Sequence, residues 1–274
     1  MNIRLAIRNF RKFIKALPVS AVNKKRRFVR LTWWQSPMIF FFDKADKSIF
    51  SVHSRHYVDS LTADEIYTNH NYDLSRLKRC DSIFDTYEAI IKKGNTPLII
   101  DCGANSGLAS RYFAKTFPKA RIIGIEPDAG NVEIARKNCK GIKAITIQQA
   151  AIGAKAGFAN IQNLEASANA IRVELSDKPT EIPITTIPNI VRDIARNDKN
   201  TNFELFMVKI DIEGFEDDLF SCNTSWIAEL PLLSIELHDW MLPHQGKSRH
   251  FLKAVSKYDR DFVYIEDNVY SIKN

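Results

Sequence analysis

The stretch Ile99-Ile100-Asp101-Cys102-Gly103-Ala104-Asn105-Ser106-Gly107 decides the fold of this chain. It begins as a short apolar run, turns through two glycines and leads into residues 108–115, where apolar side chains recur at helical spacing. This order predicts a buried strand, a tight turn and a helix. In a doubly wound α/β sheet such a turn lies at the carboxyl end of the first strand, where backbone N–H groups face a ligand.

The spacing of the two glycines indicates the kind of ligand. A dinucleotide site requires G-x-G-x-x-G, because its second glycine lets the backbone approach a pyrophosphate. Asn105 occupies that position here, which argues against a nicotinamide-dependent oxidoreductase. Asp101 suits a ligand with a cationic amine, and Glu126, after the next apolar run, can accept hydrogen bonds from both hydroxyls of a ribose. These residues predict a nucleoside site without phosphate, and S-adenosylmethionine fits that description.

Apolar runs and helical segments alternate after the breaker Gly94-Asn95-Thr96-Pro97. The alternation predicts an α/β fold with a doubly wound, mostly parallel sheet that helices cover on both faces. Residues 158–187 are polar and β-rich, and we expect them to form a hairpin inserted in the sheet. The strands are expected at 98–102, 120–125, 143–149, 205–212 and 232–237, with a closing hairpin within 262–272.

Three segments are expected along the chain. Residues 1–30 form a basic amphipathic segment, residues 31–96 form an α+β extension with a hairpin and a helical lid region, and residues 97–274 form the ligand-binding domain. Strand-like runs within 37–53 predict the hairpin. Tyr67 and Tyr72 are candidates for lining an acceptor site as part of the lid.

Positive charge is concentrated at the N-terminus. Residues 1–30 hold ten Lys and Arg side chains and no Asp or Glu, so subtracting these ten from the net charge of +7 leaves −3 for the rest. An acidic main domain argues against a nucleic-acid partner. Apolar residues at helical spacing within 1–17 predict a basic helix that either lies on an anionic membrane surface or packs on the main domain.

Cysteine usage and hydropathy indicate the compartment. The four cysteines are far apart and form no metal-binding pair, which is typical of a reducing compartment. The longest apolar run, Met38–Phe42, is far shorter than the ~20 residues of a membrane span. We therefore expect a cytoplasmic protein, with residues 1–30 as a means of peripheral attachment to the cytoplasmic face of a membrane.

Ionisable residues follow the fourth and fifth predicted strands. Strand alternation is expected to place Asp211 and Glu213 on one side, where they could hold a cofactor amine, orient an acceptor, or bind Mg²⁺ together with Glu236. His238 titrates near neutral pH and is the candidate base. Two structural alternatives stay open, namely that the carboxylates cap a helix start and that His238 is a hydrogen-bonded core residue.

Four separated motifs resemble the FkbM family of S-adenosylmethionine-dependent methyltransferases. The resemblance implies a seven-stranded sheet with its last strand antiparallel, and O-methylation of sugars or other secondary metabolites. The motifs, which the segment Ala150-Ala151-Ile152-Gly153 accompanies, are Ile100 to Gly107, Glu126-Pro127, Lys209 to Glu216, and Ser234 to His238.

Motifs and resemblance together predict an S-adenosylmethionine-dependent O-methyltransferase that acts on a hydroxyl of a small molecule or glycan. The alternatives are a non-catalytic, membrane-associated scaffold with the same fold and a nicotinamide-dependent oxidoreductase. The expected catalytic residues are His238, Asp211 and Glu236. The expected cofactor-binding residues are Asp101, Gly103, Ala104, Asn105, Gly107, Glu126, Pro127, Ala151 and Asp211.

Overall fold

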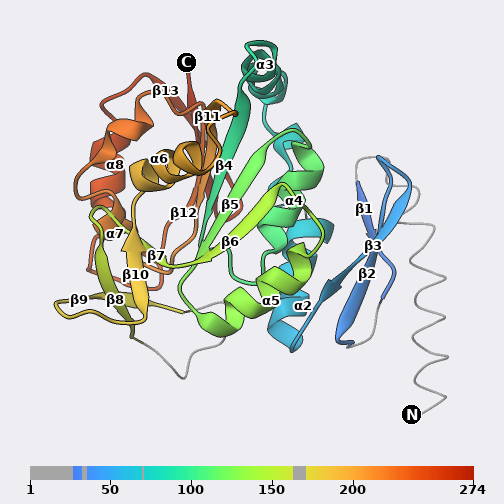
Figure 1. The fold of residues 1–274 in the computed structure, drawn as a ribbon, viewed down its shortest axis with the longest axis horizontal. Coiled ribbons are helices and arrows are strands. Elements are labelled where there is room, and N and C mark those ends of the chain that lie inside the picture. Colours follow the sequence, from blue (N-terminus) through green and yellow to red (C-terminus); the bar gives the residue numbers. More distant parts are fainter. Residues whose placement is uncertain (1–26, 33–35, 70, 163–170) are drawn as a thin grey trace. The chain divides into compact units, whose positions relative to one another are not determined.

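The computed structural model describes residues 27–32, 36–69, 71–162 and 171–274. The chain divides into two compact units between Tyr72 and Asp73 (Figure 1). The basic helix expected within 1–17 lies outside the described residues. Within the described part of the chain, no helix has both the length and the apolar character needed to cross a bilayer.

The first unit is a three-stranded antiparallel sheet in the order β1-β2-β3, followed by helices. The expected hairpin within 37–53 is confirmed by the pairing of β2 with β3. The elements of this unit are β1 (Phe28–Arg30), β2 (Met38–Asp43), β3 (Ser48–His53), helix α2 (Tyr57–Ala63) and the π-helix η1 (Asp64–Thr68).

Aromatic rings form the core of this unit, and an Arg27–Asp43 ion pair links its first two strands. Tyr67 is fully buried, with ring centroids of Phe28, Phe41 and Phe50 at 5.0–5.2 Å. The prediction that Tyr67 lines an acceptor site is wrong, because its ring fills the core of this unit. Arg27 forks onto both oxygens of Asp43, so the last residues of the expected 1–30 segment belong to this small sheet.

The second unit is built on a seven-stranded sheet in the order β13-β14-β12-β11-β4-β5-β6. Strands β6, β5, β4, β11 and β12 run parallel, whereas β14 is antiparallel to both of its neighbours. The mostly parallel sheet with an antiparallel last strand is therefore confirmed. The strands are β4 (Thr96–Cys102), β5 (Arg121–Glu126), β6 (Ile145–Gln149), β11 (Phe203–Ile210), β12 (Leu232–Glu236), β13 (Arg260–Ile265) and β14 (Asn268–Lys273).

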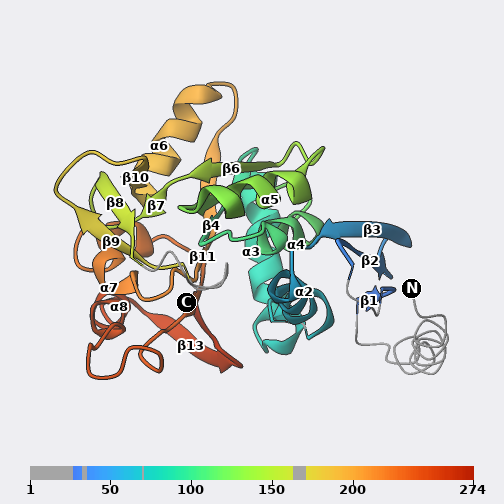
Figure 2. The ribbon, with the colours of Figure 1, turned by 90° about the horizontal axis from the view of Figure 1, so that it is seen from below.

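Helices cover both faces of this sheet (Figures 1 and 2). Alternate residues of the central strands pack against α6, α7 and α8 on one face, and α4 and α5 pack on the other. The helices of this unit are η2 (Leu74–Arg76), α3 (Cys80–Lys92), α4 (Leu108–Thr116), α5 (Ala129–Cys139), α6 (Ile187–Asn197), α7 (Glu216–Leu219), η3 (Thr224–Ile227) and α8 (Arg249–Val255).

A second sheet lies outside the main one. The expected hairpin within 158–187 exists as the pair β8–β9, but its predicted placement in the main sheet is wrong, because it joins β10 and β7 in a separate sheet of order β7-β10-β8-β9. Apolar side chains of this sheet form their own small core, against which Phe215 packs. Its strands are β7 (Ala151–Ile152), β8 (Gly157–Ile161), β9 (Val173–Ser176) and β10 (Ile182–Thr185).

Helix α3 belongs to the second unit, so the unit boundary precedes Pro97 by a whole helix. The Tyr87 ring lies 5.1 Å from Phe117 and 5.5 Å from Phe206, measured between ring centroids. Its hydroxyl oxygen accepts a hydrogen bond of 2.8 Å from the Lys119 backbone N–H. The apolar face of α3 is thus buried on the sheet, and the breaker at 94–97 is only a turn within the unit.

Replacing Phe117 by Ala should lower the free energy of unfolding by about 3–5 kcal/mol, because it empties a ring-sized volume in the core. Phe117 is 1% exposed and touches the rings of Phe84, Tyr87 and Phe206. Urea denaturation measures the change. Phe262→Ala is the matched control, since Phe262 is 47% exposed and its loss should cost no more than about 0.5 kcal/mol. Equal losses for both variants would contradict this account of the core.

Candidate functional site

The turn after β4 brings two neighbouring strand ends together. Gly103 has φ +77°, and a Cβ placed there would lie 1.8 Å from the Asp211 carbonyl oxygen. The Asp211 backbone N–H in turn donates to the Cys102 carbonyl oxygen at 3.1 Å. Only a glycine fits at this contact, because its neighbour is backbone that cannot rotate away.

Most N–H groups of this turn bond within the protein and not toward a ligand. Gly103 and Ala104 both donate to the Ile125 carbonyl oxygen, at 3.0 and 2.9 Å. Asn105 N–H donates to the Glu126 carboxylate at 2.8 Å. The expectation that N–H groups of the glycine turn face a ligand is therefore wrong for these residues. The turn lacks the cradle of free donors that a phosphate needs.

Glu126 is held rigidly at the end of β5. It is 4% exposed and also accepts hydrogen bonds from the Asp128 backbone N–H at 3.0 Å and the Asn131 amide at 3.2 Å. Burial raises the pKa of Glu126 to about 7, although the hydrogen bonds from Asp128, Asn105 and Asn131 act in the opposite direction. This carboxyl group therefore changes charge near neutral pH.

A cavity opens where the ends of β4, β5 and β11 meet. Apolar side chains from Ile152, Val173 and Phe215 form part of its wall. Six of the nine predicted cofactor-binding residues line it, namely Gly103, Asn105, Glu126, Pro127, Ala151 and Asp211. The cavity therefore joins motifs that lie more than a hundred residues apart in the chain.

The other three predicted residues, Asp101, Ala104 and Gly107, are not among those that line the cavity. Asp101 is fully buried, accepts a hydrogen bond from Ser110 Oγ at 2.6 Å, and lies 3.2 Å from Lys209 Nζ. Ala104 packs in an apolar cluster with α5. At Gly107, a Cβ would lie 3.0 Å from Ala135 Cα, so this glycine allows α4 and α5 to approach closely.

Lys209 is the partner of Asp101, a pairing that was not predicted from the sequence. It is 2% exposed, lies opposite Asp101 in the β11–β4 pairing, and approaches Asp211 Oδ2 at 3.4 Å. It also donates to the Gly103 carbonyl oxygen at 2.7 Å. The signal was a lysine within an otherwise apolar strand, since a charge buried there requires a charged or polar partner.

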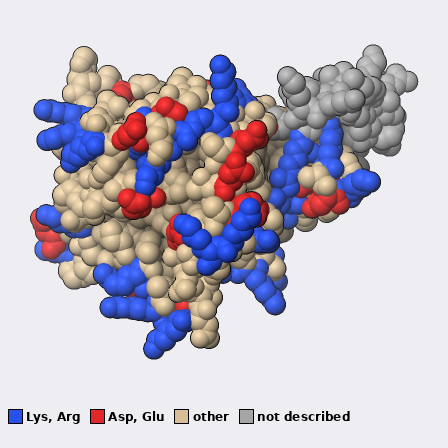
Figure 3. All heavy atoms as spheres, turned by 90° about the horizontal axis from the view of Figure 1, so that it is seen from above, with Lys and Arg blue, Asp and Glu red and all other residues tan. Residues whose placement is uncertain are grey.

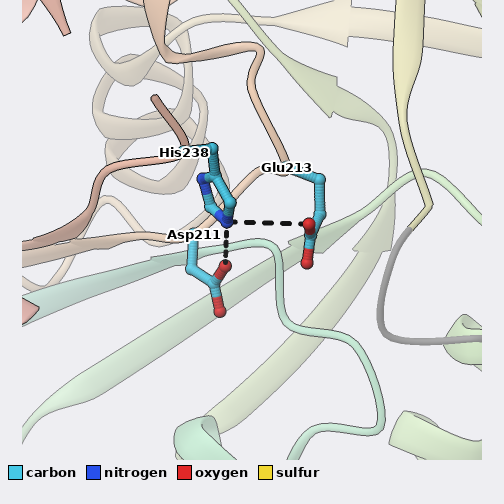
Figure 4. Close-up of side chains that lie close together, drawn as sticks. All are labelled: Asp211, Glu213 and His238. Carbon is cyan, nitrogen blue, oxygen red and sulfur yellow. Dashed lines mark ion pairs between the residues drawn. The ribbon is translucent and has the colours of Figure 1, made fainter. Parts of the chain in front are cut away.

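His238 lies at the centre of a carboxylate cluster, defined here as Asp211, Glu213, Glu216 and Glu236. Its Nδ1 is 2.9 Å from Glu216 Oε1. Its Nε2 lies 3.7 Å from Asp211 Oδ1, 3.6 Å from Glu213 Oε2 and 3.8 Å from Glu236 Oε1. In Figure 4 the Nε2 edge of the ring points toward Asp211 and Glu213. The predicted catalytic residues His238, Asp211 and Glu236 are thus brought together, with Glu216 as a partner that the predicted set lacked.

A left-handed turn brings Glu213 into this cluster. Strand β11 ends at Ile210, so the expected strand alternation does not extend to Asp211 and Glu213. Glu213 has φ +56° and Gly214 has φ +97°, which reverses the chain direction. The expectation that both carboxylates face one site is correct, but the reason lies in this turn and not in a pleated strand.

The cluster holds protons near neutral pH. Burial alone would lower the pKa of His238, but the hydrogen bond to Glu216 and the charges of Glu216, Asp211 and Glu213 raise it to about 9. Burial and the charge of Asp211 raise the pKa of Glu213 to about 8 and that of Glu236 to about 7. In the ligand-free protein His238 is therefore protonated at pH 7, and it can act as a base only after releasing that proton.

Replacing Gly103 by Ala should destabilise the protein more than replacing Gly141 by Ala. Both glycines have positive φ, +77° and +84°, but a Cβ at Gly141 meets nothing within 4 Å. Gly141→Ala should therefore cost only the conformational strain of about 1–2 kcal/mol. Gly103→Ala should cost a further ~1–3 kcal/mol, because the Asp211 backbone must move. Chemical denaturation compares the two, and similar losses would show that the Gly103–Asp211 contact relaxes easily.

Comparisons with known proteins identify the family of this chain. Residues 101–270 match the model of the Methyltransferase FkbM domain. Methyltransferase sdnD of Sordaria araneosa is 26% identical over 190 residues, which cover 68% of this chain and 59% of that protein. A 4-amino-L-phenylalanine/4-methylamino-L-phenylalanine methyltransferase of Streptomyces pristinaespiralis is 36% identical over 62 residues, covering 22% of this chain and 21% of that protein.

Among solved structures, a methyltransferase from Geobacter sulfurreducens aligns with a TM-score of 0.38 and 15% identity, over 80% of this chain and 90% of that one. The chain spans about three fifths of the length of the first curated relative and about one fifth of the second. The family match begins at Asp101 in β4 and ends in β14, so it includes the cavity and the carboxylate cluster. Since that match covers more than half of the sequence, the chain belongs to the FkbM methyltransferase family.

Proposed function

We propose that this protein transfers a methyl group from S-adenosylmethionine to a hydroxyl of a saccharide or related metabolite. One observation carries the proposal: the nucleoside cavity and the carboxylate cluster share Asp211 and Glu213. Both residues line the cavity, and both lie within 3.7 Å of His238 Nε2. A bound cofactor and ionisable groups for proton transfer therefore meet at one place.

The cavity residues fit the proposed cofactor. Asn105 lines the cavity, and its Oδ1 is buried with no hydrogen-bond partner among the described residues. This orphaned acceptor suits a ligand with a donor group, and the carboxylates of Glu126 and Asp211 suit ribose hydroxyls and a cationic amine. When bound, S-adenosylmethionine supplies a methyl group on a sulfonium, which an oxygen nucleophile displaces directly.

The chain's own residues would position the acceptor and take its proton. As the acceptor oxygen bonds to the methyl carbon, the carbon–sulfur bond breaks and the hydroxyl proton must leave. With a pKa of about 7, Glu236 can accept that proton in its ionised form near neutral pH, and His238, whose pKa is about 9, takes part once it has passed its own proton on. Glu216, whose Oε1 lies 2.9 Å from Nδ1, keeps the imidazole oriented.

The remaining proposals concern partners and location. Of the basic segment 1–30, residues 1–26 are proposed to attach the enzyme to an anionic membrane surface on the cytoplasmic face, near a glycan or hydroxyl-bearing acceptor, because residues 28–30 form the buried strand β1. No nucleic-acid partner is proposed, and on the face in Figure 3 basic and acidic side chains are interspersed. A variant without residues 1–26 keeps β1 intact and distinguishes the enzyme hypothesis from the scaffold hypothesis. An enzyme should keep its turnover while losing liposome binding, whereas a scaffold has no turnover to keep.

S-adenosylhomocysteine should bind in calorimetry, and NAD⁺ run beside it should not. The affinity for S-adenosylhomocysteine should rise by up to about tenfold from pH 6 to pH 8. The carboxyl group of Glu126, with a pKa near 7, goes from mostly protonated to mostly ionised over that range. The ionised form of Glu126 has an acceptor position on Oε2 left for a ribose hydroxyl, beside the bonds from Asn105, Asp128 and Asn131.

Glu126→Gln is the matched variant, since glutamine resembles the protonated carboxyl group in shape. It should bind more weakly at pH 8 and show no rise between pH 6 and pH 8. Binding of NAD⁺ alone would refute the proposed function. A rise with pH that persists in Glu126→Gln would assign the titration to another group.

Replacing His238 by Asn should lower methyl transfer by ~10²-fold or more, because it removes one of the two groups proposed to take up the proton. Affinity for S-adenosylhomocysteine should not change, since His238 is not among the residues that line the cavity. Transfer of a labelled methyl group to a panel of saccharides, phenols and aryl amines measures the effect.

His244→Asn is the control, because His244 is an exposed histidine whose φ of +66° asparagine tolerates. It should retain full turnover. Unchanged turnover in His238→Asn would remove His238 from the mechanism. Transfer to amines and to no hydroxyl would replace O-methylation by N-methylation.

A further inference from the structure

We propose that Asp211, Glu213 and His238 form a binding site for a divalent transition-metal ion of the Mn²⁺ class. The inference rests on the proposed function, because two of the three residues also line the cofactor cavity. This site differs from the Mg²⁺ site expected from the sequence in its ion and in having His238 as a ligand.

The distances fit atoms that share an ion better than atoms that bond to each other. His238 Nε2 lies 3.7 Å from Asp211 Oδ1 and 3.6 Å from Glu213 Oε2, and the ligand atoms of the three residues all lie within 4.8 Å of one another. Such separations exceed the ~3.2 Å of a good hydrogen bond. Ligands that each lie ~2.2 Å from one metal ion are separated by roughly 3–4.4 Å.

The hydrogen bond of Nδ1 orients the imidazole so that Nε2 can bind a metal ion. Nδ1 is 2.9 Å from Glu216 Oε1, and Glu216 is itself fully buried. A histidine that binds a metal through one nitrogen commonly donates its other N–H to a carboxylate, which sets the tautomer and the ring orientation. Nε2 faces the carboxylates, whose nearest oxygens lie 3.6–3.8 Å away. The proton that Nε2 carries at pH 7 in the metal-free protein would be displaced when an ion binds, and the lone pair would then face Asp211 and Glu213.

The imidazole is also more deeply buried than the carboxylates it faces. His238 is 2% exposed, whereas the side chains of Asp211 and Glu213 are 29% and 20% exposed. A polar side chain that is almost completely buried requires a partner for each polar atom. A metal ion at this point would bind Nε2 in place of its ion-pair contacts with the carboxylates, and it would be reached from their exposed side.

Charge favours a cation at this position. The carboxylates of Asp211, Glu213 and Glu236 surround Nε2, and Glu216 lies behind the ring. Lys209 forms ion pairs with both Asp211 and the buried Asp101. One lysine therefore serves two carboxylates. Glu213 and Glu236, which hold protons near neutral pH, become negatively charged when an incoming cation displaces those protons.

The donor set selects the class of ion. Mg²⁺ and Ca²⁺ prefer sites made of oxygen ligands alone, whereas one imidazole nitrogen with two carboxylates suits Mn²⁺ and its first-row neighbours. Three protein ligands leave positions open for an acceptor oxygen, whose proton becomes more acidic next to the ion. With the ion bound, His238 would be a ligand, and Glu236, 3.8 Å from Nε2, would accept the proton without His238.

The test uses the full chain after EDTA treatment and buffer exchange. Mn²⁺ is titrated in, and electron paramagnetic resonance follows the loss of the free-ion signal, with thermal unfolding in parallel because a ligand that binds the native state raises the Tm. We expect one Mn²⁺ per chain and a higher Tm. An equal concentration of Mg²⁺ should not displace it, and displacement would overturn the assignment of the ion class.

Variants separate ligation from folding. His238→Asn and Glu213→Gln should abolish binding, and Glu213 is the safer test because it lies on a loop. Glu216→Gln should weaken binding ~10- to 100-fold while leaving every ligand in place. Asp217→Asn, the next residue on α7, is the matched control and should bind as the parent does. Absence of binding, or equal binding in all variants, would overturn the proposal.

The same samples distinguish this inference from the proposed function. Calorimetry with S-adenosylhomocysteine is run on the EDTA-treated protein. Nucleoside binding without Mn²⁺ binding would overturn the metal site alone. Mn²⁺ binding without nucleoside binding would overturn the methyltransferase proposal and leave the metal site standing.

Discussion

Lys209 and Asp101 form a buried ion pair at the centre of the main sheet. The two residues lie opposite each other on β11 and β4, 3.2 Å apart and almost inaccessible to solvent. Removing water from either charge costs several kcal/mol unless the partner is present, so each residue requires the other. The same ammonium group donates to the Gly103 carbonyl oxygen and approaches Asp211. One cation therefore fixes both backbone segments on which the cavity is built.

Asp211 connects this ion pair to the cavity and to His238. Its backbone contacts the glycine turn, while its side chain lies between the cavity and His238. In the proposed function, the cofactor side and the acceptor side of the site consequently share one rigid element. This geometry suits a direct displacement, in which positioning of the reacting atoms supplies most of the catalytic effect.

Local patterns were sufficient for part of the site. Gly103, Asn105 and Glu126 could be assigned from the sequence, because each follows the end of an apolar strand and strand ends meet at one edge of a parallel sheet. Asp101 satisfied the same pattern, yet its partner proved to be Lys209 on a strand more than a hundred residues away. Glu216 belonged to a motif, but its bond to His238 joins α7 to the end of β12. Neither pairing has a signal in local spacing.

The sequence by itself determined the type and order of the main elements, the glycine turn and the strand-end residues that line the cavity. These depend on periodicity and on backbone conformations that only certain residues adopt. The tertiary structure alone decided that residues 158–187 form a separate sheet, that α3 joins the second unit, and that four carboxylates surround one imidazole. Strand neighbours and buried charges are chosen by packing across long sequence separations, where alternation along one strand carries no information about its partner.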